Sequence, residues 1–358
     1  MNRLIRAVID THALRHNLRT IREHARGARV MAVVKANAYG HGLIPTALAL
    51  AEADAFAVAR LEEGLALRAA GITQPIVLLE GVFAPEHLLE TARHGFDLVV
   101  HDPLQIELLE EYSGAARFLI WIKIDTGMNR LGFRPEEFPE ALARIQRLQP
   151  APLEIRLLTH LARADERDDT MTREQLARFK KATSGLDYAV SIANSAGLFG
   201  RVQLGCDWVR PGLALYGGSP FEDRSSAELG LHPVMSLETS VIATRKVATG
   251  ETVGYGGTWR ASHDSVIAIV AAGYGDGIAR NLAGGTPVLI DGQRAPLVGR
   301  VSMDMIAVDV TKLNGVHVGT PVVLWGVGLP VEEIARYAAT IPYELLCGVS
   351  QRVPLELR

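Results

Sequence analysis

Cysteine is nearly absent from this chain: Cys206 and Cys347 are the two cysteines among 358 residues. They lie far apart and match no C-x-x-C spacing, which argues against a disulfide scaffold and a zinc-binding cysteine cluster. We therefore expect no metal site, and we expect the protein to work in a reducing compartment, the cytoplasm.

Long apolar runs are also missing. The N-terminal MNRLIRAVIDTHALRHNLRTIREHA is too interrupted by charge for a signal peptide, and no window approaches the ~18 apolar residues of a membrane span. The net charge of -3 gives no electrostatic reason to expect nucleic acid or an anionic membrane as a partner. The composition, 48% hydrophobic and 22% charged, is ordinary for a globular enzyme that acts on small molecules.

The first two thirds of the chain alternate apolar, β-branched runs with amphipathic stretches such as 135–149 and 171–183, as repeated βα units do. Each apolar run is suited to a strand that is covered on both faces, which favours a (β/α)8 TIM barrel over an open sheet. Eight strands are expected, beginning near Val30, Ala55, Pro75, Phe96, Phe118, Leu153, Asp187 and Asp207.

The pattern changes after about Gly218 to short strands punctuated by glycine and proline. We therefore expect a barrel domain over residues 1–222, followed by a mainly-β C-terminal domain over residues 223–358. The opening strand, about residues 3–9, precedes the first barrel helix and is expected to pair with the C-terminal sheet.

Polar residues at the C-terminal ends of barrel strands face the active site. Lys35 stands out among them because it directly follows MAVV and precedes the turn-forming ANAYGHG, whereas most lysines lie on a solvated surface. An amine at the mouth of an apolar barrel is partly desolvated, which favours its neutral form and Schiff-base chemistry with an aldehyde. The same rule selects Lys35, Arg60, His101, Lys123, Asp125, Arg130, His160, Asn194, Ser195 and Arg210.

The loops after strands seven and eight normally build the phosphate site of such a barrel, and here they contain NSAGLFG and RPGLALYGG. Ser195 and the backbone amides of Gly212 and Leu213 are candidates to hold a phosphate dianion. A glycine-rich loop alone is often only a turn. Together with a nucleophilic lysine at the same barrel mouth, it predicts a ligand that is both an aldehyde and a phosphate ester.

AVVKANAYGHG resembles the cofactor-lysine motif of the alanine racemases. The resemblance continues, in order and over essentially the entire chain, through KIDTGMNRLGF, THLARAD, ANSAG, VRPGLALYG, VGYGGTW, GYGDG, GRVSMDM and IPYELL. It implies a fold-type III pyridoxal 5'-phosphate enzyme that racemises L-alanine and D-alanine and works as a head-to-tail homodimer with shared active sites. Such an enzyme either supplies D-alanine for peptidoglycan or degrades it.

The resemblance also implies two catalytic residues. Lys35 matches the lysine that holds the cofactor as a Schiff base and acts on one face of the substrate Cα. Tyr255 matches a tyrosine that comes from the other subunit and acts on the opposite face, and racemisation needs such a pair. A phenol acts as a base at neutral pH only near positive charge or a hydrogen-bond donor. His160 is the expected neighbour of Tyr255, with Arg210 behind it.

Further roles follow from the same resemblance. Arg210 matches the donor to the pyridine nitrogen of the cofactor. Because a guanidinium keeps its proton, Arg210 leaves the pyridine ring a weaker electron sink than an aspartate at this position would. Arg130 matches the arginine that binds the substrate carboxylate. Cofactor binding is expected of Tyr39, His160, Asn194, Ser195, Gly212, Leu213 and Tyr343, substrate binding of Met303 and Asp304 from the partner subunit, and an entryway role of Asp165, Tyr274, Arg280 and Arg300.

Lys123 follows apolar residues on the fifth strand, where a bare ammonium is costly to bury. Several family members carry a carbamate at the matching lysine, and we hypothesise one here that orients Arg130.

Three alternative functions stay open at this point. A non-catalytic barrel that binds pyridoxal phosphate resembles a lone barrel without the β domain. A fold-type III amino-acid decarboxylase pairs the cofactor nitrogen with an acidic residue, where this chain has Arg210. A racemase of serine or another amino acid is harder to distinguish from sequence, because one methylene is worth only ~1 to 3 kcal/mol of discrimination.

Overall fold

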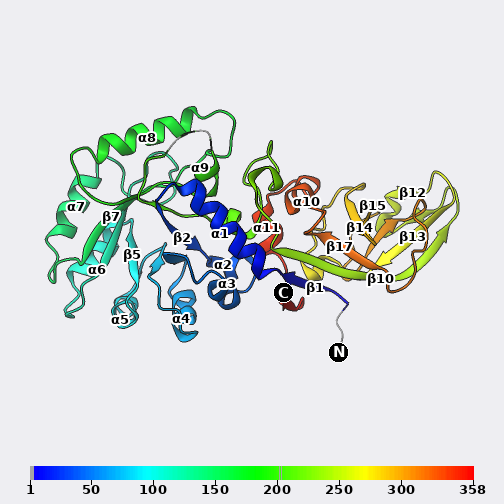
Figure 1. The fold of residues 1–358 in the computed structure, drawn as a ribbon, viewed down its shortest axis with the longest axis horizontal. Helices are drawn as coiled ribbons and strands as arrows, with labels where there is room; N and C mark the ends of the chain where they lie inside the picture. Colours follow the sequence, from blue (N-terminus) through cyan, green and yellow to red (C-terminus); the bar gives the residue numbers. More distant parts are fainter. Residues whose placement is uncertain (1–3, 201, 203) are drawn as a thin grey trace.

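The computed structural model describes residues 4–200, 202 and 204–358. A barrel and a β domain lie next to one another along the long axis of the molecule (Figure 1). The barrel consists of eight parallel strands, and the β domain is built on an eight-stranded sheet. The predicted fold class, a (β/α)8 TIM barrel followed by a mainly-β domain, is confirmed.

The barrel strands follow one another around the barrel in chain order, and each begins within a few residues of its predicted start. Closure depends on the shortest strands, because the two-residue β9 pairs with β8 on one side and with β2 on the other. The strands are β2 (Arg29–Val33), β3 (Ala55–Val58), β4 (Ile76–Leu78), β5 (Asp97–Val100), β6 (Leu119–Lys123), β7 (Glu154–Leu158), β8 (Val190–Ser191) and β9 (Trp208–Val209).

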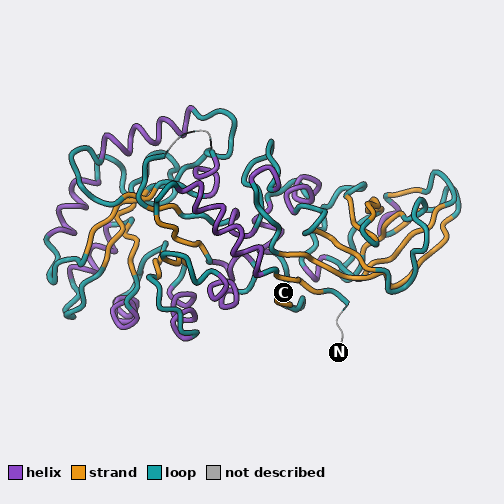
Figure 2. Tube along the Cα trace, viewed as in Figure 1, coloured by secondary structure: helices purple, strands orange, loops and turns teal. Residues whose placement is uncertain are grey.

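Helices surround the barrel strands (Figure 2). Their ends follow local rules: Asp102 caps α6 by accepting a hydrogen bond from the Leu104 amide, and proline occupies the first helical position. The helices are α1 (Thr11–Ala25), α3 (Leu43–Ala49), α4 (Leu61–Ala69), α5 (Pro85–His94), α6 (Pro103–Glu110), α7 (Phe138–Gln146), α8 (Thr170–Ala182) and α9 (Ser195–Phe199). Over the described residues, no helix has the length and apolar character needed to cross a membrane.

Two tryptophans and an arginine fill the floor of the barrel. The Arg156 guanidinium lies 5.2 Å from the ring centre of Trp121 and 5.1 Å from that of Trp208. Because β6 and β9 are not neighbours, the contact between the two indole rings crosses the barrel interior. Side chains two residues apart on a strand point the same way, so Lys123 and Arg210 form the next layer, toward the mouth.

The β domain is a mixed sheet in which the first strand of the chain takes part. Strand β1 (Arg6–Ile9) pairs antiparallel with β10 (Met235–Val247) and parallel with β18 (Leu355–Leu357). The predicted range of this strand began at residue 3, which lies outside the described residues. The remaining strands are β11 (Thr252–Val253), β12 (Trp259–Arg260), β13 (Ser265–Val270), β14 (Pro287–Ile290), β15 (Gln293–Val298), β16 (Ile306–Asp309) and β17 (Pro321–Trp325).

Two short helices, α10 (Val331–Tyr337) and α11 (Pro342–Cys347), lie between the sheet and the barrel (Figure 1). α11 packs against the loop after β2 so closely that a Cβ on Gly40 would lie 2.2 Å from the carbonyl oxygen of Leu346. Only glycine permits this approach. The contact brings Tyr343, on the first turn of α11, to the mouth of the barrel.

Candidate functional site

Lys35 begins the short segment α2 (Lys35–Tyr39), immediately after β2. Ala36 to Tyr39 all have positive φ, between 52° and 54°. A left-handed conformation costs about 1–2 kcal/mol for a residue with a Cβ, so the surroundings must hold this run in place. The Ala36 amide donates to Glu63 Oε1 at 2.6 Å, and Nδ1 of the buried His41 lies 2.9 Å from the Tyr39 carbonyl oxygen.

Four residues of the predicted cofactor set lie together on one side of the mouth. Ser195 Oγ accepts hydrogen bonds from the amides of Gly212, at 3.0 Å, and Ala214, at 3.2 Å. A Cβ on Gly212 would lie 2.4 Å from the Tyr39 hydroxyl, and the rings of Tyr39 and Tyr343 are 5.8 Å apart. Hydroxyl groups and backbone amides directed at one place are suited to bind an anion such as phosphate. The amide of Ala214 was not in the predicted set.

Leu213 and Asn194 have structural roles in this arrangement. Leu213 begins the buried 3-10 turn η1 (Leu213–Tyr216), which directs the amides toward Ser195. Asn194 Oδ1 accepts a hydrogen bond from the Gly197 amide at 2.8 Å and so caps α9. The cap fixes Ser195 at the first position of that helix.

Arg210 is buried at the base of the mouth. Its Nη1 donates to Ser191 Oγ at 2.5 Å and its Nη2 to the Thr159 carbonyl oxygen at 2.6 Å. Nε has no partner among the described residues. Burial lowers the pKa of Arg210 to about 10, which still leaves the guanidinium protonated at neutral pH. It therefore offers a charged donor from a fixed position.

Positive charge dominates the mouth. Burial, together with the charges of Arg210, Arg130, Lys123 and Lys35, lowers the pKa of His160 well below its ordinary value. The imidazole is therefore neutral at neutral pH. Four cationic side chains around one neutral ring favour ligands that bring negative charge, such as a phosphate and a carboxylate.

Lys123 is buried among these cations. Burial and the positive charges of Arg130 and Arg210 lower the pKa of Lys123 to about 8, while Asp125 acts in the opposite direction. At pH 8 about half of such amines are neutral, compared with less than about 1% of ordinary lysines. Neutral amine is the form that reacts with electrophiles.

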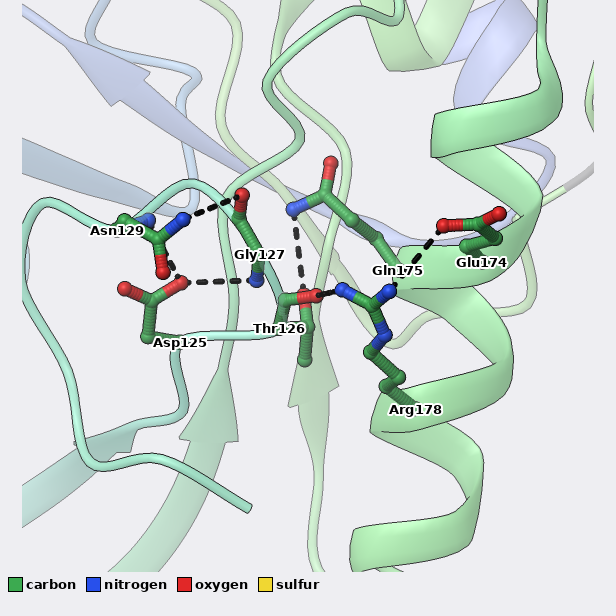
Figure 3. Close-up of polar contacts among 7 residues, drawn as sticks. All are labelled: Asp125, Thr126, Gly127, Asn129, Glu174, Gln175 and Arg178. Atoms are coloured by element: carbon green, nitrogen blue, oxygen red, sulfur yellow. Dashed lines mark hydrogen bonds and ion pairs between the residues drawn. The ribbon is translucent and has the colours of Figure 1, made fainter.

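The turn that carries Arg130 is ordered by Asp125 (Figure 3). Asp125 Oδ1 accepts hydrogen bonds from the amides of Gly127, at 2.9 Å, and Asn129, at 3.1 Å. Arg130 itself is exposed at the rim, where a ligand can reach its guanidinium.

Tyr255 lies far from this mouth within one chain. It begins the turn η3 (Tyr255–Gly257), which precedes β12 at the end of the β domain away from the barrel (Figure 1). Its side chain is 66% exposed. One chain therefore does not bring Tyr255 next to His160 or Lys35.

A second group of predicted residues lies, like Tyr255, on the β domain. Arg300 packs against the glycines that flank Tyr255. The turn η4 (Tyr274–Asp276) hydrogen-bonds to the loop between β15 and β16, because the Gly275 amide donates to the Met303 carbonyl oxygen at 2.9 Å. The Met303 side chain is 53% exposed.

The other predicted β-domain residues have partners within the chain. The Arg280 guanidinium lies 5.6 Å from the ring centre of Tyr274, and Asp304 pairs with Arg352 at 2.6 Å. Asp165 lies instead at the barrel mouth, near Tyr343. Burial of the Tyr343 phenol, and to a smaller extent the negative charge of Asp165, raises the pKa of Tyr343 to about 12.

Two residues that the strand-end rule selected have local structural roles. Arg60 is the N-cap residue of α4. His101 is buried, and its Nε2 lies 3.0 Å from the Glu80 carbonyl oxygen. Within the described parts of the chain, no cluster of three histidine, cysteine or acidic side chains is placed to hold a metal ion.

Comparison with known proteins gives close relatives over the whole length. Family models described as "Alanine racemase, N-terminal domain" and "Alanine racemase, C-terminal domain" match residues 9–220 and 234–357. The alanine racemase of Nitrosococcus oceani is 49% identical over 97% of this chain and 98% of its own length. The biosynthetic alanine racemase of Escherichia coli is 48% identical over 98% of each.

Solved structures agree with the sequence comparison. The structure of the biosynthetic alanine racemase from Pseudomonas aeruginosa has a TM-score of 0.96 and 44% identity, and covers 99% of both chains. That of the alanine racemase from Acinetobacter baumannii has a TM-score of 0.94 and 40% identity, over 99% of this chain and 100% of the other.

Proposed function

This chain belongs to the alanine racemase family, whose members are isomerases, and from that membership we propose that it interconverts L-alanine and D-alanine with pyridoxal 5'-phosphate bound at Lys35. The observation that carries the proposal is the barrel mouth. There Lys35, the buried donor Arg210 and the Ser195–Gly212 anion cradle lie together.

The residues at the mouth fit this cofactor. The cradle of Ser195, Tyr39 and backbone amides suits its phosphate, and Arg210 Nε suits its ring nitrogen. When bound, the cofactor withdraws electrons from the substrate Cα and so acidifies the Cα–H bond. Arg210 does not give up its proton, so the ring nitrogen would stay unprotonated and would withdraw electrons less strongly than it would beside an acidic residue. Weaker withdrawal favours racemisation over competing reactions.

Two protein groups then move the proton. Lys35 Nζ removes or returns it on one face of Cα, and the Tyr255 hydroxyl does so on the other. Because Tyr255 is exposed and distant from its own barrel, we propose that it serves the barrel of a second subunit in a homodimer with shared sites. The exposure of Tyr255 and Met303, 66% and 53%, supports such a role because each is free to contact another chain.

The substrate carboxylate is assigned to Arg130, at the rim, with Met303 and Asp304 approaching from the other subunit. The relatives from Escherichia coli and Pseudomonas aeruginosa are named biosynthetic, which favours a role in supplying D-alanine, as peptidoglycan synthesis needs.

We further propose a carbamate on Lys123. The neutral amine adds to CO2 and releases one proton, and the resulting anion lies among the cations of the mouth, beside Arg130. At a fixed CO2 pressure, carbamate occupancy should rise as the pH increases toward and beyond about 8, the lowered pKa of Lys123. Carbon-13 NMR under labelled CO2 should show the carbamate carbon in the wild type and in a Lys181→Met control, but not in Lys123→Met. Equal spectra for all three proteins would contradict the assignment.

A chiral assay of purified protein on a panel of amino acids tests the reaction class. L-alanine and D-alanine should each reach an equal mixture of the two, because mirror-image molecules have equal free energy. Release of CO2 would indicate the decarboxylase alternative instead, and faster turnover of serine or of a larger amino acid would indicate a different racemase.

A further inference from the structure

Gln175, on α8, is fully buried and all its side-chain hydrogen-bonding groups have partners in active-site loops. Oε1 accepts from the Ala162 amide at 2.9 Å. Nε2 donates to the His160 carbonyl oxygen at 2.9 Å and to Thr126 Oγ1 at 3.3 Å. One side chain therefore joins the loop after β7 to the loop after β6.

The network continues from Thr126 to the base of the mouth. Thr126 Oγ1 and Thr159 Oγ1 lie 2.9 Å apart, and the Thr159 carbonyl oxygen accepts from Arg210 Nη2 at 2.6 Å. On the other side, Thr126 adjoins Asp125, whose turn carries Arg130 (Figure 3). Arg178, one turn after Gln175, donates to the Thr126 carbonyl oxygen at 3.1 Å.

We propose that Gln175 is a positioning residue that holds the loops of His160 and Arg130, and through Thr126 the guanidinium of Arg210, in one arrangement. This role goes beyond the proposed function and rests on it. A buried amide that satisfies three partners fixes their relative positions, and its loss leaves buried donors and acceptors unsatisfied. A displacement of about 1 Å among such groups is enough to reduce turnover about 100-fold.

Gln105 provides a matched control, because it makes the same kind of bridge elsewhere. It is buried on α6, its Oε1 accepts from the His101 amide at 2.8 Å, and its Nε2 donates to the Glu80 carbonyl oxygen at 2.9 Å. The loops that it joins, after β4 and β5, supply no residue to the proposed site. Gln105→Leu therefore measures what the loss of a buried bridging amide does to folding alone.

The experiment compares Gln175→Leu with Gln105→Leu in the full-length protein with cofactor. We expect both to lower Tm by a similar amount. Only Gln175→Leu should lower kcat for alanine, by about 10- to 100-fold, and weaken the binding of pyridoxal phosphate to the cofactor-free protein. Thr126→Val should act in the same direction, and Thr126→Ser, which keeps the hydroxyl, should restore kcat to within about twofold of the wild type.

Gln175→Glu separates positioning from folding in a second way. The glutamate is nearly isosteric and can still accept from the Ala162 amide, but only its protonated form can donate to the His160 carbonyl oxygen. The ratio of variant kcat to wild-type kcat should therefore rise as the pH falls. A purely structural role predicts no such trend.

Equal kcat and equal cofactor affinity for Gln175→Leu and Gln105→Leu would overturn the inference, as would a pH-independent ratio for Gln175→Glu. The wild type is run in the same assay. If the wild type does not racemise alanine, the proposed function fails, and the comparison of cofactor affinity still decides the role of Gln175.

Discussion

Lys35→Ala is expected to abolish racemisation and, with it, the visible absorbance of the bound cofactor. Lys35 supplies both the covalent link and the acid–base group on one face of Cα, so a single change removes two contributions. General acid–base catalysis alone is worth about 10²- to 10⁴-fold, and the loss of the link should bring turnover below detection. Absorbance spectra and a chiral assay of the same preparation test both effects.

Lys180→Ala is the control for Lys35, because Lys180 is exposed in the last turn of α8. It should retain the absorbance and the activity of the wild type. A Lys35→Ala protein that keeps the absorbance band and racemises alanine would show that another amine holds the cofactor.

Tyr255→Phe is expected to keep the cofactor and lose most turnover, by about 10²- to 10⁴-fold. The side chain is 66% exposed in one chain, so removing its hydroxyl should leave the fold intact. With the Lys35 face still functional, the α-hydrogen of one enantiomer of alanine should continue to exchange with deuterium from D2O. The α-hydrogen of the other enantiomer should not.

Tyr337→Phe serves as the control for this change, since Tyr337 is a partly exposed tyrosine of the same domain and has no assigned role. NMR of alanine in D2O measures exchange from each enantiomer separately. If Tyr255→Phe exchanges both at wild-type rates, the assignment of one face to each residue is wrong.

Sequence patterns predicted the barrel well because its strands are apolar on both faces. Even β8 and β9, with two residues each, lie where their apolar runs indicated. For the second domain, the short strands between glycine and proline predicted a mainly-β fold but not the arrangement of its strands. Its strand order, in which β14 lies between β15 and β17, depends on long-range pairing that local patterns do not encode.

The backbone conformation around Lys35 could be predicted less well from the sequence. The segment ANAYGHG indicates a turn, but no local rule predicts four successive left-handed residues with side chains, because each is individually unfavourable. The run is held by distant partners such as Glu63 and by the close approach of α11. These contacts exist only after the barrel has closed.

Some site residues came from the strand-end rule and others only from the resemblance. The rule selected Lys35, Arg130 and Arg210 because they follow barrel strands. It could not select Tyr255, which lies in the other domain, on a turn between short strands. Neither the strand-end rule nor the resemblance selected Gln175, because the sequence of an amphipathic helix does not show that a single glutamine on it faces inward.

Purified heterodimers of Lys35→Ala and Tyr255→Phe chains, obtained by co-expression with two different tags, test the shared site most directly. Each parent homodimer lacks one group in both of its sites. In the heterodimer, one site loses both groups while the other combines an intact Lys35 with an intact Tyr255. A shared site predicts about half of the wild-type racemase activity per dimer. Activity no greater than that of the parent homodimers would contradict it.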